Sequence, residues 1–208
     1  MAHKARKSHK LRLLTAGQTF VTKVLAFALA LIVAFATLPA VSVLADLSSA
    51  NNWARPYIST AIERGIVPPA LQQRYTQGIT RAEFSALAVA LYETVTNRVI
   101  TERTLFNDTT DLNVQKMGGL GVVTGVGGGN FNPNGNITRE QAALIIVRLA
   151  GVAGRPLPIP LTASNFVDNV MIESWARDAA GQVQAAGMMT GSNGLFNPKG
   201  MEMTTFKI

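Results

Sequence analysis

The sequence contains no cysteine, and its only two histidines, His3 and His9, lie in the first ten residues. Without cysteine the chain can form no disulfide, no thiolate metal site and no thiol nucleophile. The absence of histidine from residues 46–208 excludes an imidazole general base and the common zinc sites from that part of the chain. We therefore expect a non-catalytic protein without cofactor or metal.

Residues 1–45 also lack acidic residues, although they hold six of the 19 Lys and Arg residues. The net charge of +7 comes almost wholly from this tail, because the rest of the chain has 13 basic and 12 acidic residues. A basic chain suggests a nucleic-acid partner only when its charge is spread over a folded face. We expect no nucleic-acid partner here.

The same tail has the pattern of a secretory signal peptide, predicted as a helix over residues 1–45. Its basic residues, the last of them Lys23, precede Val24–Ala36, which contains no polar residue. Pro39 then interrupts the helix, and Ala45 supplies a small residue before the expected cleavage point. The alternative is a membrane anchor, because Val24–Ala45 has no charge and is long enough to span a bilayer. The short apolar core and Pro39 favour cleavage, and hence a secreted protein that meets a membrane only during export.

Two segments 58 residues apart share a polar motif and the helical register that follows it. Thr80-Arg81-Ala82-Glu83 matches Thr138-Arg139-Glu140-Gln141, and apolar residues recur at equal offsets behind both. Trp53-Ala54-Arg55 and Trp175-Ala176-Arg177 form another matching pair, each at the start of a short amphipathic segment that ends in glycine. Repeats of this size bury their apolar faces only together. We predict a mainly α fold of helix-loop-helix repeats, since no long strand pattern occurs.

The shared polar motif has the spacing of a helix capping box. Thr80 and Glu83 lie three residues apart directly before an apolar run, and Thr138 and Gln141 repeat the arrangement. In such a box the threonine hydroxyl and the glutamate or glutamine side chain each accept a hydrogen bond from a backbone amide of the other residue. These four residues are expected to start helices.

Arginine follows the capping threonine in both motifs, which helix stability alone does not explain. The positive end of the helix dipole disfavours a cation at the first helical position by about 0.3–1 kcal/mol. A guanidinium beside free helix amides forms a strong site for a carboxylate or phosphate. We therefore expect Arg81 and Arg139 to bind an anion, the alternative being a salt bridge to Asp108 or Asp168.

Three further features carry weaker expectations. Trp53 and Trp175 fall on apolar faces and are expected in the core, the alternative being an exposed edge that stacks on a sugar. The segment Gly125–Gly129 resembles a phosphate loop, but no strand precedes it and no helix follows at once, so we expect a flexible loop that approaches a ligand closely. Asp108 and Asp111 lack the spacing of a calcium-binding EF-hand.

Taken together, these motifs resemble the S-layer homology family. They comprise Phe-x-Asp at 106–108 and 166–168, Trp-Ala at 53–54 and 175–176, glycine with two apolar residues from 65, 121 and 187, Phe-x-Pro at 131–133 and 196–198, and Ile-Thr-Arg at 79–81 and 137–139. The resemblance implies three repeats in a pseudo-threefold bundle, over residues 46–100, 101–160 and 161–208. Repeat 1 lacks the aromatic-x-Asp opening, and repeat 3 lacks the Thr-Arg motif and its second helix.

Members of that family attach surface proteins noncovalently to a pyruvylated secondary polysaccharide associated with peptidoglycan. The resemblance therefore implies a secreted cell-wall-binding module at the cell surface. It implies that the following residues contact the acidic sugar, the two arginines as anchors and the others in support: Arg81, Arg139, Asp108, Asp168, Trp53, Trp175, Gly125 and Gly191.

Two alternatives stay open. The chain could be the N-terminal part of a larger S-layer protein or surface-anchored enzyme, such as a wall or polysaccharide hydrolase that uses Glu83 with Asp108 or Asp168 as paired carboxylates. It could also self-associate through its incomplete third repeat, because a missing helix would expose the partner faces of the others.

Overall fold

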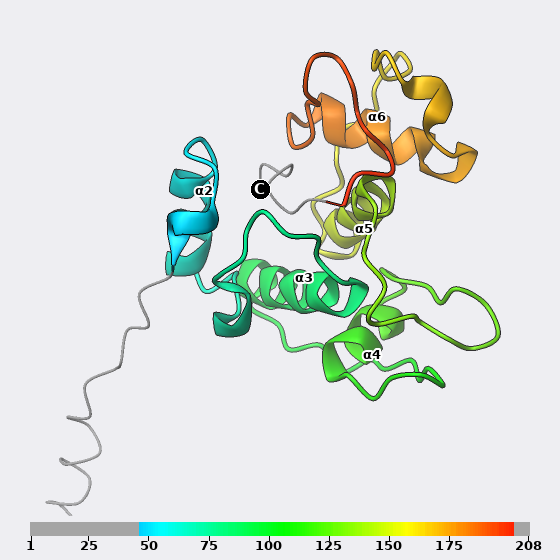
Figure 1. Cartoon of the computed structure of the whole chain (residues 1–208). Coiled ribbons are helices and arrows are strands. Elements are labelled where there is room, and N and C mark those ends of the chain that lie inside the picture. The colour runs from blue at the N-terminus through cyan, green and yellow to red at the C-terminus, as the bar shows by residue number, and fades with distance from the viewer. Residues whose placement is uncertain (1–45, 202–208) are drawn as a thin grey trace, which may run out of the picture. The chain divides into compact units, whose positions relative to one another are not determined.

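The computed structural model describes residues 46–201, which are mainly α-helical (Figure 1). Within this range there are five α-helices, four short 3-10 helices and no β-strand: η1 Leu47–Ser49, α2 Arg55–Glu63, η2 Pro69–Leu71, α3 Arg81–Thr96, α4 Leu112–Gly119, α5 Arg139–Val152, η3 Asn169–Met171, η4 Ser174–Ala176 and α6 Arg177–Ala185. The prediction of a mainly α fold is confirmed. The signal peptide and its alternative, a membrane anchor, lie outside the described residues. None of the helices between residues 46 and 201 has the length and apolarity needed to cross a membrane.

The two long helices begin where the capping motifs predict. At α3, Thr80 Oγ1 accepts a 3.2 Å hydrogen bond from the Glu83 amide, and Glu83 Oε2 accepts a 2.8 Å bond from the Thr80 amide. At α5, the Thr138 amide donates a 3.1 Å hydrogen bond to Gln141 Oε1. The Gln141 amide donates a 3.4 Å bond to Thr138 Oγ1. Because a capping box satisfies helix amides locally, a segment of four residues suffices to predict it.

Each of two short helices packs on the long helix that precedes it in the chain. Figure 1 shows α4 beside α3, and α6 beside α5. Their apolar faces form one buried cluster, to which α4 contributes Val114 and Met117 and α6 contributes Ala180 and Val183. The apolar periodicity therefore corresponds to packing between a long helix and the short helix that follows it in the chain.

Helix α2 belongs to a smaller apolar cluster. Its Ala61 packs with Ile66, Val67 and Leu71 of the following loop, and this cluster meets α3 at Leu87. Helix α2 is thus joined to α3 through the segment that follows it.

The expectation that the two tryptophans lie in the core is wrong. Trp53 is 45% exposed and Trp175 is 48% exposed. The helices α2 and α6 begin only two residues later, so each tryptophan precedes the helical face on which the prediction placed it. The residue after each tryptophan is buried instead: Ala54 follows Trp53, and Ala176 follows Trp175.

Candidate functional site

A groove beside the start of α3 brings together three of the residues expected to contact a ligand and one expected helix-capping residue. It has a volume of about 300 Å³ and lies between the loop after α4, one face of α5, and η4. The expected residues in its wall are Arg81, Gly125, Gln141 and Trp175, although Gln141 was expected only to cap a helix. The full lining is Arg81, Val122, Val123, Thr124, Gly125, Val126, Gln141, Leu144, Ile145, Arg148 and Trp175.

Arg81 is held in the groove wall by the loop of the following repeat. Its Nε donates to the Phe131 carbonyl and its Nη2 to the Thr124 carbonyl, both at 2.9 Å. The guanidinium carbon lies 4.5 Å from the centre of the Phe131 ring, within the range of a cation–π contact. These bonds use only two of the guanidinium's N–H donors, and the residue remains in the groove lining.

Burial, with only 9% of Arg81 exposed, lowers the pKa of its guanidinium, and the charge of Asp108 partly opposes that shift. Arginine nevertheless stays protonated in proteins. Arg81 is therefore a fixed cation at the edge of a partly apolar groove, where a positive charge attracts an anion more strongly than in water.

The helix amides beside Arg81 are not free, which corrects one premise of the predicted anion site. The amides of Arg81 and Ala82 donate to the carbonyls of Gly135 and Pro133, at 2.9 and 3.1 Å. The start of α5 is covered in the same way, by carbonyls in the segment 198–200 at 2.8 and 3.0 Å. The loop of the next repeat crosses each helix start, so an anion would be bound by side chains rather than by the helix terminus.

The two predicted aspartates hold these loops in place. Asp108 accepts backbone hydrogen bonds from the amides of Phe131 at 2.8 Å and Asn132 at 2.7 Å, one on each carboxylate oxygen. Asp168 accepts two bonds of 2.7 Å from the amides of residues 196–197. Both aspartates therefore position the loop that packs on an arginine.

The alternative of a salt bridge between Arg81 and Asp108 is not realised. The ion pairs within residues 46–201 are Arg74–Glu83, Lys116–Glu93, Lys199–Glu140 and Lys199–Glu173. The pKa of Asp108 is lowered mainly by the bond from the Phe131 amide, and Arg81 adds a weaker effect in the same direction. The carboxylate thus acts on the guanidinium through space while its hydrogen bonds go to the backbone.

Arg139 repeats the environment of Arg81 in the next repeat. It is 4% exposed, and its guanidinium carbon lies 5.2 Å from the centre of the Phe196 ring. Burial lowers the pKa of this guanidinium, and the charge of Asp168 opposes the shift. Arg139, Asp168 and Gly191 belong to this second environment, and neither they nor Trp53 line the groove beside Arg81.

Both predicted loop glycines are required by close backbone packing. A Cβ on Gly125 would lie 2.5 Å from the Asn130 carbonyl oxygen, and one on Gly191 would lie 2.5 Å from that of Leu195. These separations leave no room for a side chain. Gly125 therefore supplies a narrow turn whose backbone forms part of the groove wall.

Arg148 is a groove residue that the sequence reasoning missed. It lies on α5 and lines the groove together with Gln141. The signal was available, because residues seven apart share one face of a helix. The groove therefore holds two arginines and an exposed tryptophan, and its lining includes no carboxylate.

Part of the sequence matches a known family, and most of it matches segments of larger proteins. Residues 113–143 match the model of the family described as the S-layer homology domain. The chain is 29% identical over 155 residues to an endoglucanase of Bacillus sp. (strain KSM-635), 27% identical over 161 residues to an amylopullulanase of Thermoanaerobacterium thermosulfurigenes, and 26% identical over 162 residues to exoglucanase XynX of Acetivibrio thermocellus.

These matches cover 72%, 72% and 73% of this chain but only 16%, 8% and 14% of the three relatives. The chain therefore spans less than a fifth of the length of each of them. The family match includes most of α4, the loop around Gly125 and the start of α5, and the loop and α5 start supply six of the eleven residues that line the groove. The chain thus carries an S-layer homology domain.

Proposed function

We propose that this chain is a secreted, noncovalent cell-wall-binding module that holds an acidic secondary polysaccharide in the groove beside Arg81. The polymer class is a pyruvylated glycan associated with peptidoglycan, and the protein acts at the cell surface. The observation that carries the proposal is the convergence of Arg81, Arg148 and exposed Trp175 on one groove.

Each of these side chains matches one part of such a ligand. A guanidinium presents several N–H donors in a plane that fits a carboxylate, and the ketal carboxylate of a pyruvylated sugar is such a group. An exposed indole offers a flat apolar surface against which a sugar ring can pack. Gly125 adds a wall without side-chain bulk, which lets a sugar approach the backbone closely.

The same groove supports binding rather than hydrolysis. Glycoside hydrolysis ordinarily requires two carboxyl groups flanking the scissile bond. The groove lining has none. Glu83 accepts bonds from the Thr80 amide and hydroxyl, and both oxygens of Asp108 accept backbone amides. The carboxylates considered as a catalytic pair are thus committed to a helix start and a loop.

The decisive experiment is cosedimentation of the full 208-residue chain with purified cell walls. Arg148→Ala and Trp175→Ala alter the groove without removing the bonds that fix Arg81 to its loop. We expect each to weaken retention roughly tenfold, equivalent to about 1.4 kcal/mol. Arg98→Ala is the matched control, because Arg98 is exposed and does not line the groove. Undiminished retention of the Arg148 and Trp175 double variant would place the ligand elsewhere.

Chemical removal of the acidic polymer from the walls tests the ligand class. The proposal requires retention of the unaltered chain to disappear with the polymer and to return when the polymer is added back. Retention that survives on stripped walls would assign the binding to peptidoglycan itself and overturn the choice of an acidic glycan.

A second proposal is that this segment attaches a larger polysaccharide-degrading enzyme. It is favoured by the three relatives, which are an endoglucanase, an amylopullulanase and an exoglucanase that extend far beyond the matched region. Immunoblotting of source cells with antibodies to residues 46–201 distinguishes the cases. A band at 22.2 kDa or below opposes this proposal, whereas a much larger band that degrades glycan in a zymogram supports it.

A further inference from the structure

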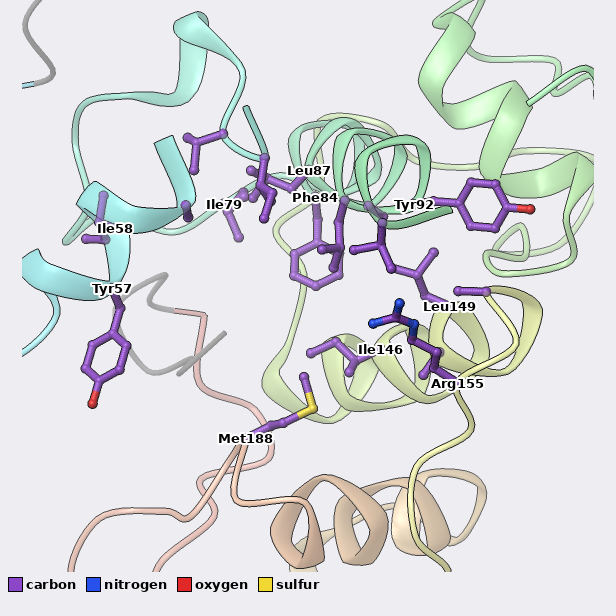
Figure 2. Close-up of a pocket in the computed structure, with 18 of the residues that line it drawn as sticks. Tyr57, Ile58, Ile79, Phe84, Leu87, Tyr92, Ile146, Leu149, Arg155 and Met188 are labelled. Atoms are coloured by element: carbon purple, nitrogen blue, oxygen red, sulfur yellow. The ribbon is translucent and has the colours of Figure 1, made fainter. Parts of the chain in front are cut away.

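The groove beside Arg81 differs in chemistry from a second cavity, which lies between α2, α3 and α5 (Figure 2). The side chains that line the second cavity are apolar apart from one arginine and three tyrosines. In the groove, Arg81, Gln141, Arg148 and Trp175 all carry N–H donors. Polar recognition of a sugar therefore belongs to the groove, and Gln141 is the one of these four donors without a part in the proposed function.

The capping box at the start of α5 fixes the orientation of the Gln141 side chain. Its Oε1 accepts a 3.1 Å hydrogen bond from the Thr138 amide. Because a backbone amide donates only to an oxygen, the oxygen and nitrogen of this side chain cannot be exchanged, and Nε2 lies at the other branch with two N–H donors. Among residues 46–201, neither of the hydrogen bonds that Gln141 makes uses Nε2. A groove residue is thus held in place by one end while its donor end has no protein partner in that range.

Glu83 occupies the equivalent position in the other capping box and shows that a carboxylate caps a helix as well. Its Oε2 accepts a 2.8 Å bond from the Thr80 amide. A negative charge is also the better choice in the first turn of a helix, because it complements the helix dipole. Glu83 does not line the groove, and its Oε1 lies 3.8 Å from a nitrogen of Arg74. Glutamine therefore replaces glutamate at the one of these two positions that faces the groove, and helix stability does not explain the choice.

Electrostatics in the groove does explain it. A carboxylate at position 141 would share the groove with Arg81 and Arg148, where it would repel an anionic ligand and compete with it for the guanidinium groups. An amide caps the helix without adding that charge. It also supplies two donors where glutamate would supply none.

We propose that Gln141 determines the specificity of the groove by donating from Nε2 to a sugar oxygen of the acidic glycan while Oε1 caps α5. This inference rests on the proposed function, since it takes the acidic glycan as the ligand. Gln141 and Arg148 are seven residues apart on one face of α5, about 10 Å along the helix axis, with Leu144 and Ile145 between them in the groove lining. The glycan lies along this face, with its carboxylate at an arginine and an oxygen acceptor at Gln141. The side chain is already held by the cap, so less conformational freedom is lost when the glycan binds.

Two substitutions separate the donor from the charge, and both are read by titrating the full 208-residue chain with purified cell walls. Gln141→Met removes the donors without adding charge and should weaken retention about fivefold. Gln141→Glu keeps the capping acceptor, should leave the melting temperature unchanged, and should weaken retention tenfold or more. Gln115→Glu is the matched control, because it adds the same charge on α4 at a residue that does not line the groove. Its retention should change little.

A second control separates ligand contact from helix capping. Thr138→Val removes the hydroxyl that accepts from the Gln141 amide, but it leaves the Thr138 amide that holds Gln141 Oε1. Thr138 does not line the groove. Thr138→Val and Gln141→Met should both lower the melting temperature, but only Gln141→Met should weaken retention. Equal losses of retention in the two variants would show that Gln141 acts through the helix start alone and would overturn the inference.

The same titration with Arg148→Ala and Trp175→Ala distinguishes failure of this inference from failure of the proposed function. If these two variants weaken retention while Gln141→Met and Gln141→Glu do not, the proposed function stands and the role of Gln141 is overturned. If all four variants bind like the unaltered chain, the glycan does not occupy this groove and both are overturned. If Gln141→Glu weakens retention and Gln141→Met does not, the residue only keeps negative charge out of the groove, which overturns its role as a donor.

Discussion

The guanidinium carbon of Arg81 lies 4.5 Å from the ring centre of Phe131, a residue 50 positions further along the chain. The same guanidinium donates to the Phe131 and Thr124 carbonyls. Arg81 thus joins the start of α3 to the loop of the next repeat while it forms part of a groove wall. A substitution at this position changes the fold and the proposed ligand site together.

The first prediction concerns the stability that Arg81 provides. Arg81→Ala leaves two carbonyls without their partner and removes the contact with Phe131, so we expect a loss of about 3 kcal/mol in the free energy of unfolding. Arg81→Lys keeps the charge but cannot reproduce both bonds, and should cost about half as much. Urea unfolding followed by circular dichroism measures both, with Arg98→Ala as a control expected to change little. Unaltered stability of Arg81→Ala would show that the bonds contribute no net stability.

The second prediction is a pH dependence that originates at Asp108. Two backbone amides and the nearby Arg81 lower the pKa of this carboxyl in the folded protein below its ordinary value of 3.8. A lowered pKa means that the stabilisation is fully present above pH 3.8 and is lost as the pH falls through the folded-state value. The advantage of the unaltered chain over Asp108→Asn should therefore be largest near pH 7 and shrink below pH 3.8. Urea unfolding at a series of pH values tests this, and a constant difference down to pH 2 would contradict it.

The sequence predicted best those features that depend on neighbouring residues. The capping boxes at Thr80 and Thr138 need only a spacing of three, and the structure contains both. The predicted core position of Trp175 was wrong because α6 begins two residues later than the pattern indicated. Helix starts shift easily by this amount, and such a shift moves a side chain to another face.

Features that depend on distant segments could not be read from the sequence. Nothing near Arg81 indicates that carbonyls 43 and 50 residues away accept its hydrogen bonds. The same holds for the helix amides, which are covered by a loop more than 50 residues further along. Arg148 is different, because its spacing of seven from Gln141 places both on one helical face and could have identified it.

The third prediction compares two glycines in helices. A Cβ on Gly119 of α4 would lie 2.4 Å from the backbone carbon of Glu102, which cannot move without displacing the chain. Gly119→Ala should therefore destabilise the protein by about 3 kcal/mol. Gly151 of α5 has open space around its Cβ position, and Gly151→Ala should stabilise by about 0.5 kcal/mol. Thermal unfolding of the two variants gives the signs directly, and an undiminished melting temperature of Gly119→Ala would show that α4 can move away from residue 102.

The fourth prediction uses the two tryptophans as reporters of the groove. Trp53 and Trp175 are the only tryptophans of the chain and are exposed to nearly the same extent, but only Trp175 lines the groove beside Arg81. Binding of an acidic wall glycan should exclude water from the Trp175 indole and shift its emission to shorter wavelength.

Single substitutions separate the two signals. In Trp53→Phe the emission shift on adding the glycan should persist, and in Trp175→Phe it should vanish while the fluorescence of Trp53 remains. Because the ligand is held by Arg81 and Arg148, the glycan concentration needed for half of the shift should rise as salt is added. A shift that persists in Trp175→Phe, or that is insensitive to salt, would mean that the glycan docks away from Arg81 and Arg148, which line the groove together with Trp175.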